Sequence, residues 1–327
     1  MTVLVTGSSG HLGEALLRTL QAQRREVIGI DVLPGAFTHQ IGSITDRAFV
    51  RRCMQGVTTV LHAATLHKPH VATHSRQDFV DVNISGTLNL LEEAAAAGVT
   101  AFVYTSTTSV FGDALVPPPG EPAAWITEDV TAVPKNIYGV TKAAAEDLCQ
   151  LFARNHSLRA IVLRTSRFFP EEDDNPAIRE AYTDTNIKTN ELLYRRVDIE
   201  DVVSAHLLAA AHAPSAGFAK YIISATTPFS RHDVAELRND APLVVRRYAP
   251  DYQAEFARRG WTMLPGIDRV YVNDRARAEL GWQPRHDFRA LMARLRAGED
   301  IRSPLAREVG SKGYHDRDFR EGPYPVA

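Results

Sequence analysis

A glycine-rich turn near the N-terminus constrains the fold of this chain more than any other feature. It reads Thr6-Gly7-Ser8-Ser9-Gly10-His11-Leu12-Gly13 and lies between the apolar run Val3-Leu4-Val5 and a helical pattern. Glycines at this spacing let the backbone turn tightly and approach a pyrophosphate, which then lies on the free N–H groups of the helix. A turn that only needs flexible residues is the alternative. Because this turn joins the first strand to the first helix, we expect the phosphate loop of a dinucleotide-binding domain.

Apolar runs alternate with helical patterns along the first 225 residues. The runs are apolar throughout, which is typical of a parallel sheet covered on both faces. The expected strands are residues 3–5, 27–30, 57–62, 101–104, 161–163 and 221–223, and the expected helices are 12–23, 81–97, 138–155 and 202–213. This alternation predicts an α/β fold with a Rossmann-type, doubly wound parallel sheet.

The remaining residues indicate a second, smaller lobe. Residues 169–189 are rich in Pro, Asp, Glu and Asn, and from Pro228 onward the chain is rich in Arg and less regular. We expect the sheet domain to cover 1–165 and to be completed by about 198–225. The lobe is expected at about 166–197 and 226–300, followed by an extended C-terminal arm at 301–327.

Composition excludes several classes of protein. The net charge is −2 and the basic residues are scattered, so a nucleic-acid-binding surface is not expected. The two cysteines, Cys53 and Cys149, lack metal-ligand spacing, which favours a reducing compartment. No signal peptide or membrane span is expected at the N-terminus or elsewhere. We therefore expect a cytoplasmic protein.

An acidic residue ends the second expected strand and bears on the choice of cofactor. Asp31 is followed by Val32, Leu33 and Pro34, with no Arg or Lys nearby. A carboxylate here can accept hydrogen bonds from both hydroxyls of the adenosine ribose and would repel a 2′-phosphate. The sequence therefore favours NAD over NADP. The alternative is that Asp31 only caps a turn.

The segment that starts the 138–155 helix carries a candidate catalytic pair. Tyr138 and Lys142 are four residues apart, so their side chains lie on one helical face. A free phenol has a pKa of about 10, too high for a base at neutral pH. A neighbouring ammonium and a nicotinamide cation would favour the phenolate and make Tyr138 an acid/base group.

These motifs, taken together with others in the same order, resemble a known family. The others are Leu61-His62-Ala63-Ala64, Asn83 with Gly86-Thr87-Leu88-Asn89-Leu90-Leu91, 104–112, 196–202 and 278–284. The chain closely resembles the extended short-chain dehydrogenases, in particular the NAD-dependent epimerase/dehydratase branch. The resemblance implies that the C-terminal lobe binds substrate and that Lys142 also contacts the nicotinamide ribose.

The resemblance also implies roles for further residues. The catalytic Ser/Thr of the family falls on Thr107, whose hydroxyl would hold the substrate oxygen beside Tyr138; the alternative is a β-branched residue that closes a strand. Cofactor contacts are implied for Ser43, Ile44, Ala63, Ala64 and Asn83, in addition to the phosphate loop and Asp31.

Three departures from the family pattern narrow the chemistry. The usual adenine-side Asp after Gly42 is Ser43, and Asp46 is expected to cap the next helix instead. Dehydratases carry two acidic residues after the catalytic Thr, where this chain has Thr108 and Ser109, so dehydration is not expected. Arg167 occupies the position of an Asn in nucleotide-sugar epimerases, which argues against a standard UDP-sugar site.

Substrate contacts are predicted for residues at the expected carboxyl edge of the sheet. His67, with His62, His70 and His74, is expected to line the substrate pocket and not to bind a metal. Arg167, Arg195 and Arg196 could anchor an anionic group or form surface salt bridges. Ser106 and Thr108 are further candidates beside Thr107. The Ala runs at 94–97 and 143–145 are compatible with a homodimer or with ordinary helix propensity.

The leading functional hypothesis is an NAD-dependent oxidoreductase that acts at a hydroxyl or carbonyl carbon of a sugar-like or other small polar substrate. The first alternative is a sugar or nucleotide-sugar epimerase with tightly bound NAD. The second alternative is a non-catalytic NAD-binding regulator, against which the Tyr138–Lys142 pair argues.

Overall fold

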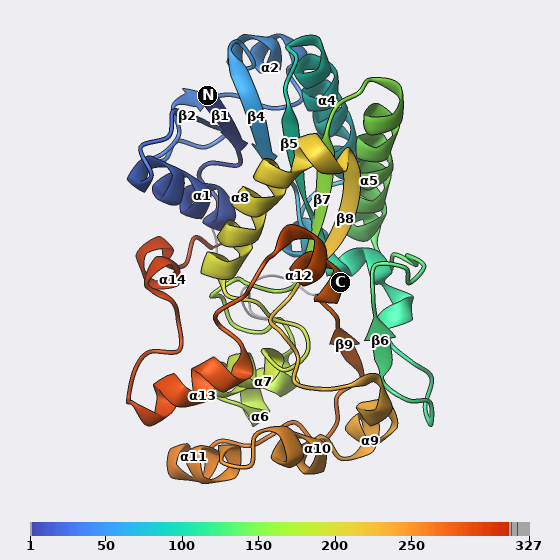
Figure 1. Cartoon of the computed structure of the whole chain (residues 1–327), viewed down its shortest axis with the longest axis vertical. Coiled ribbons are helices and arrows are strands. Elements are labelled where there is room, and N and C mark those ends of the chain that lie inside the picture. The colour runs from blue at the N-terminus through green and yellow to red at the C-terminus, as the bar shows by residue number, and fades with distance from the viewer. Residues whose placement is uncertain (1, 314, 316–318, 320–327) are drawn as a thin grey trace.

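A seven-stranded parallel sheet forms the centre of the computed structural model, which describes residues 2–313, 315 and 319. Its strand order is β3-β2-β1-β4-β5-β7-β8 (Figure 1). Strands β2 and β3 are therefore added on one side of β1, and the later strands are added on its other side, beginning with β4. The strands are β1 Thr2–Thr6, β2 Val27–Asp31, β3 Gln40–Ile41, β4 Val57–His62, β5 Ala101–Thr107, β7 Ala160–Thr165 and β8 Phe218–Ile223. This architecture confirms the predicted Rossmann-type fold.

Helices cover both faces of the sheet, which explains why its strands are apolar throughout. One face packs against α1 and α8, and the other packs against α2, α4 and α5. These helices are α1 His11–Ala22, α2 Arg47–Cys53, α4 Gly86–Ala96, α5 Ile137–Asn155 and α8 Ile199–Ala216. The central strands bury side chains on both faces, as parallel strands between two helical layers must.

The second lobe lies beyond the carboxyl ends of the strands (Figure 1). Its helices are α6 Pro176–Ala181, α7 Asp184–Glu191, α9 Val234–Asn239, α10 Ala241–Tyr248, α11 Tyr252–Arg259 and α13 Phe288–Arg296. A two-stranded parallel sheet, β6 Ala124–Ile126 with β9 Arg269–Tyr271, joins it. The expectation of less regular structure after Pro228 is wrong, because that stretch folds into helices of six to nine residues. Elements this short show too few turns for a helical period to be read.

Two C-terminal helices return from the lobe to the sheet domain. Helix α12, Asp274–Leu280, and the adjacent Trp282 belong to the core formed by α1 and α8, although 226–300 was expected to lie in the lobe. Helix α14, Pro304–Val309, packs on α1 and α8 within the segment expected to be an extended arm. The last part of that arm, 314, 316–318 and 320–327, lies outside the described residues. Among the described residues, no helix is long and apolar enough to cross a membrane.

Candidate active site

The glycine-rich loop has the backbone geometry that a phosphate cradle requires. Gly7 has φ +74°, and a Cβ there would lie 2.8 Å from the amide nitrogen of Ala64. A Cβ on Gly13 would lie 1.9 Å from the carbonyl oxygen of Gly7. Gly10 is the N-cap residue of α1 and provides no side-chain cap, so the first-turn N–H groups of His11, Leu12 and Gly13 remain available at the positive end of the helix dipole. The loop therefore fits a pyrophosphate.

Asp31 lies beside this loop at the carboxyl end of β2. Its Oδ2 accepts a hydrogen bond of 2.9 Å from the Ser9 amide, and its Oδ1 accepts one of 3.0 Å from the Leu33 amide. The carboxylate is only half-buried. It therefore holds the phosphate loop against β2 and keeps an exposed side on which ribose hydroxyls can bind.

The turn after β4 forms the opposite wall of the loop. The amides of Ala63 and Ala64 both donate to the hydroxyl of Thr6, at 3.1 and 3.0 Å. The same hydroxyl lies 2.8 Å from Nδ1 of His62, which is buried and whose Nε2 lies 2.9 Å from the Thr87 hydroxyl. Burial keeps the pKa of His62 well below its usual value, so this imidazole is neutral and structural.

Asn83 connects the turn after β4 to α5, the helix that carries Tyr138 and Lys142. It lies in a π-helical turn, Val80–Ser85, between α3 Arg76–Phe79 and α4, where a continuous helix from 81 was expected. Its amide nitrogen donates to the Leu66 carbonyl and to the Thr141 hydroxyl, at 2.9 and 3.0 Å. Its oxygen accepts from the Leu66 amide at 2.9 Å. With these bonds made, Asn83 acts as a positioning residue. It holds Thr141, the residue that directly precedes Lys142.

Ser43 and Ile44 lie near the end of β3, at the adenine side of the expected groove. The Ser43 hydroxyl accepts from the Thr45 amide at 3.1 Å, while Ile44 is buried against Gly86. Asp46 accepts from the amides of Ala48 and Phe49, which confirms its predicted role as the cap of α2.

Tyr138 and Thr107 meet at the carboxyl edge of the sheet. Tyr138 lies in the first turn of α5, which Asn136 caps by accepting from the Gly139 amide. Thr107 is the last residue of β5 and pairs in register with Thr165 of β7. Burial raises the pKa of Tyr138 to about 12, against the lowering effect of a hydrogen bond with the Thr107 side chain. The structure thus brings together the predicted acid/base group and the predicted hydroxyl.

Lys142 lies one turn further along α5 and is 2 % exposed. Its ammonium donates to the Thr105 carbonyl at 2.6 Å and lies 4.2 Å from the centre of the Tyr104 ring. Burial lowers the pKa of Lys142 to about 7, and the nearby Glu146 carboxylate opposes this. The expected lowering of the Tyr138 pKa by Lys142 is not found in this structure, in which burial of the phenol dominates.

Ser106 turns away from the site, and the reason is its position in a strand. Adjacent strand residues point to opposite faces, so Ser106 and Thr107 cannot both face the same ligand. The Ser106 hydroxyl donates to Glu146 at 2.6 Å. Arg164 of β7 binds the same carboxylate at 2.8 Å, and Lys220 of β8 lies 3.2 Å from it. This buried network beneath Tyr138 and Lys142 was not predicted from the sequence. Thr108, the next candidate, is buried in the short turn that follows β5.

The histidines after β4 gather beside the phosphate loop. The His67 ring lies 4.7 Å from the His70 ring and 5.4 Å from the Phe169 ring. Burial and the charges of His70, His11 and Lys142 hold the pKa of His67 well below its usual value. The rings of His70 and Phe169 thus flank His67. The described residues contain no group of three or more His, Cys, Asp or Glu side chains arranged to hold a metal ion.

Three arginines near the substrate side are balanced by carboxylates of the chain itself. Arg167 pairs with Asp173 and Glu191, and Arg195 and Arg196 pair with Glu191 at 2.7 Å each. Glu191 is 1 % exposed, and despite its burial the three guanidinium groups hold its pKa far below the usual range. The predicted anion anchors are thus already engaged within the fold.

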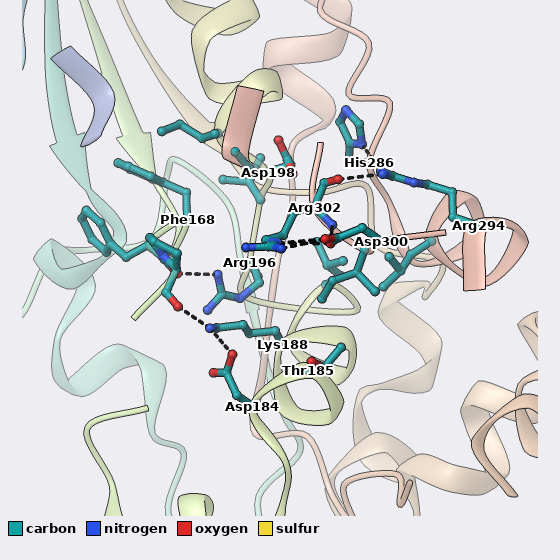
Figure 2. Close-up of a pocket in the computed structure, with 18 of the residues that line it drawn as sticks. Phe168, Asp184, Thr185, Lys188, Arg196, Asp198, His286, Arg294, Asp300 and Arg302 are labelled. Carbon is teal, nitrogen blue, oxygen red and sulfur yellow. Dashed lines mark hydrogen bonds and ion pairs between the residues drawn. The ribbon is translucent and has the colours of Figure 1, made fainter. Parts of the chain in front are cut away.

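Two cavities flank the segment 168–176, between the sheet domain and the lobe. The first, of about 500 Å³, lies between α7, α13 and residues 299–310, with Phe168 on one wall (Figure 2). Its charged side chains are paired along the rim, as Lys188 with Asp184 and Arg302 with Asp300. The second, of about 740 Å³, adjoins the loop after β4 through Lys68. Both have the size of a small-molecule site.

Comparison with known proteins gives a consistent result. Residues 3–223 match the model of the NAD dependent epimerase/dehydratase family. A UDP-glucose 4-epimerase of Azospirillum brasilense is 26% identical over 349 residues, 95% of this chain and 94% of that protein. An uncharacterised protein of Sinorhizobium fredii is 34% identical over 169 residues. That match covers 50% of this chain and 40% of the relative, and other curated relatives are likewise matched over about half of their length or less.

Solved structures also resemble this fold. A short-chain dehydrogenase/reductase superfamily protein of Agrobacterium tumefaciens, solved with bound NAD, superimposes with a TM-score of 0.66. The two are 25% identical, and the superposition covers 94% of this chain and 99% of the other.

Proposed function

Because the chain belongs to the NAD-dependent epimerase/dehydratase family, we propose that it is an NAD-dependent oxidoreductase acting at a hydroxyl or carbonyl carbon of a small polar substrate. When bound, NAD supplies the chemistry of accepting or returning a hydride. The observation that carries the proposal is the buried contact of Tyr138 with Thr107, one helical turn from Lys142.

The residues of this chain fit the cofactor at three points. The loop of Gly7, Gly10 and Gly13 admits a pyrophosphate, since a side chain at Gly7 or Gly13 would collide with backbone. Asp31 binds the adenosine ribose and favours NAD over NADP. Lys142 binds the nicotinamide ribose, with Asn83 fixing the neighbouring Thr141.

The catalytic residues hold and move protons at stated atoms. Thr107 binds the substrate oxygen through its hydroxyl and keeps that oxygen beside the phenol of Tyr138. Tyr138 takes the proton from a substrate hydroxyl, or returns it to a carbonyl oxygen. The pKa of Tyr138, about 12 in this buried site, must fall for the first step. The hydrogen bond with Thr107 acts in that direction, and the positive charge of a bound nicotinamide ring would add to it.

Epimerisation is the alternative, and the relative from Azospirillum brasilense, a UDP-glucose 4-epimerase matched over nearly its whole length, favours it. In that reaction the cofactor stays bound between two half-reactions. The departure at Arg167, which pairs with Asp173 and Glu191, is evidence for a different substrate. A regulator without turnover has no use for the Tyr138–Lys142 pair.

The substrate lies between the sheet domain and the lobe, at the carboxyl edge. A sugar-like, polyhydroxylated molecule agrees with a site where arginine charges are already balanced. We keep the division of 1–165 with about 198–225 for the cofactor, 166–197 and 226–300 for the lobe, and 301–327 for the arm, with two changes. Residues 124–126 join the lobe, and α12 joins the sheet domain.

Two further predictions concern the protein in its cell. We predict a homodimer through α4 and α5, whose outer surface exposes Val140 and Leu151. We also predict a cytoplasmic location, with which the free, buried Cys53 and Cys149 agree.

A substrate panel tests the proposal. Sugars, sugar acids, nucleotide sugars and small alcohols are incubated with the protein and NAD while NADH absorbance is followed, beside a Tyr138→Phe variant. NADH formation that disappears in the variant supports a dehydrogenase. Isomerised product without free NADH supports the epimerase. Binding of NAD without either reaction, under the whole panel, would favour a regulator.

A further inference from the structure

The C-terminal segment 303–313 crosses the sheet domain as a strap. It starts at Ser303, whose hydroxyl and amide bind the carboxylate of Asp198, the cap of α8, at 2.6 and 3.2 Å. It continues as α14 along α1 and reaches the loop after β4, where His315 Nε2 lies 3.0 Å from the Pro69 carbonyl. The strap therefore connects the phosphate loop to the loop on the other side of the cofactor groove.

Glu171 is the point to which the strap is tied. Its Oε1 accepts from the Ser311 hydroxyl at 2.7 Å and from the amides of Lys312 and Gly313 at 3.3 Å each. Three consecutive strap residues thus converge on one carboxylate oxygen. Glu171 comes from the segment after β7, so the tie bridges parts of the chain about 140 residues apart.

The same carboxylate is bound to the phosphate loop itself. Glu171 Oε1 lies 2.9 Å from Nε2 of His11, the first residue of α1. The Lys312 amide also approaches His11 Nε2, at 3.1 Å. A ring nitrogen cannot donate and accept at once, so when Nε2 carries a proton for Glu171, the Lys312 amide keeps the carboxylate as its acceptor. Although burial raises it, the hydrogen bond from His11 and the one from Ser311 hold the pKa of Glu171 at about 2.

An ion pair fixes the strap to the first turn of α1. The Lys312 ammonium contacts the carboxylate of Glu14, whose side chain is buried. Glu14 and His11 belong to the turn whose N–H groups are proposed to hold the pyrophosphate. A cofactor at this turn would lie beneath a strap that is fastened on both of its sides.

We propose that Glu171 is a positioning residue that fastens residues 311–313 across the phosphate loop, so that the strap must be released before NAD can leave. This inference rests on the proposed function. It places control of cofactor exchange in the strap.

The test measures NADH release from the full-length protein. NADH is bound, excess NAD is added, and the decrease of NADH fluorescence gives the dissociation rate. Loss of the Glu171 carboxylate removes several hydrogen bonds whose acceptor is a charged group. We therefore expect Glu171→Ala to accelerate release by about tenfold or more. Ser311→Ala removes one bond from the strap side and should accelerate release by about threefold or more. Glu172→Ala, an exposed neighbour, is the matched control.

Trypsin provides a readout that does not depend on NADH. Lys312 is held in the strap, so cleavage after Lys312 should be slow in the wild type and in Glu172→Ala, and faster in Glu171→Ala and Ser311→Ala. Because trypsin also cleaves after Arg317 and Arg320, mass spectrometry follows the peptides that begin at Gly313, which only cleavage after Lys312 creates.

The outcomes separate the two proposals. Faster release together with faster cleavage in both strap variants supports the strap. Faster cleavage with unchanged NADH release overturns it. Acceleration in Glu171→Ala but not in Ser311→Ala also overturns it, because the effect would then act through His11 alone. Absence of NADH binding to the wild type refutes the proposed function and, with it, this inference.

Discussion

Removal of Arg164 should destabilise the protein through the charge that it leaves behind. Arg164 and Glu146 are both almost fully buried, and the guanidinium donates to the carboxylate at 2.8, 3.1 and 3.2 Å. In Arg164→Met the carboxylate keeps Ser106 and the Lys220 ammonium, which is 3.2 Å away. Breaking a buried pair costs about 3–5 kcal/mol, and because Lys220 remains we expect the lower end, about 3 kcal/mol.

The stability that Arg164→Met loses should be smaller at acidic pH than at neutral pH. In the wild type, burial raises the pKa of Glu146, but Arg164 outweighs it and the net pKa is lowered. A lowered carboxyl pKa stabilises the fold above the unfolded value, and that stability is lost as the pH falls through the folded value. In Arg164→Met burial dominates and the pKa of Glu146 rises. The loss of unfolding free energy in the variant is therefore greatest near neutral pH, where the carboxyl is charged. It should become smaller between about pH 7 and pH 5, as the carboxyl is protonated.

Urea unfolding at the two pH values measures both effects. Arg159→Met, an exposed arginine one residue before β7, is the control, and Glu146→Met combined with Arg164→Met should recover part of the loss. A deficit below about 1 kcal/mol at neutral pH, or one that does not shrink in acid, would refute the argument that an unpaired buried carboxylate sets the cost.

Three further predictions address the cofactor site. Gly13→Ala should weaken NADH binding at least about tenfold, because its Cβ would lie 1.9 Å from the Gly7 carbonyl oxygen. Gly10→Ala is the control and should weaken binding less, because its Cβ would have no neighbour nearer than 3.3 Å. Equal titration curves for the two variants would contradict this. Lys142→Met should end turnover but raise the melting temperature at neutral pH. Burial lowers the pKa of Lys142 from 10.5 to about 7, so the buried charge destabilises the fold fully below pH 7, and this cost decreases as the pH rises toward 10.5. Melting curves recorded over this pH range should show a rising melting temperature in the wild type and not in the variant. Asp31→Ala should reduce the preference for NADH over NADPH by about tenfold in paired titrations, and an unchanged ratio would assign Asp31 only its bonds to the Ser9 and Leu33 amides.

Local signals were sufficient for the sheet domain and for placing Tyr138 and Lys142 on one face of a helix. The glycine loop, the apolar strands and the four-residue spacing of Tyr138 and Lys142 each depend on neighbouring residues only. The position of Ser106 could also have been derived, since alternation along β5 places it opposite Thr107. A charged residue at the end of an apolar strand, as Arg164 is in β7, likewise indicates a buried partner.

Contacts that depend on packing could not be derived in the same way. Glu146 becomes the partner of Arg164 only because α5 lies against β7, and Lys312 meets Glu14 across 298 residues of sequence. The helices after Pro228 are too short to show a period, so their existence depends on the core of the lobe and not on a local pattern.

The arginine cluster shows why the charge of a substrate cannot be inferred from sequence composition alone. Arg167, Arg195 and Arg196 together match an anion site in a sequence, yet Asp173 and Glu191 compensate them in the fold. An anionic substrate at this position would have to displace those carboxylates, which carry buried ion pairs and whose exposure would cost more than one new contact returns. A neutral, hydroxyl-bearing substrate avoids that exchange, and its oxygen needs only the Thr107 hydroxyl and the Tyr138 phenol. Within the proposed reaction, the balanced arginines therefore act to keep the wall of the site rigid, and selectivity falls to the hydroxyl groups that face it.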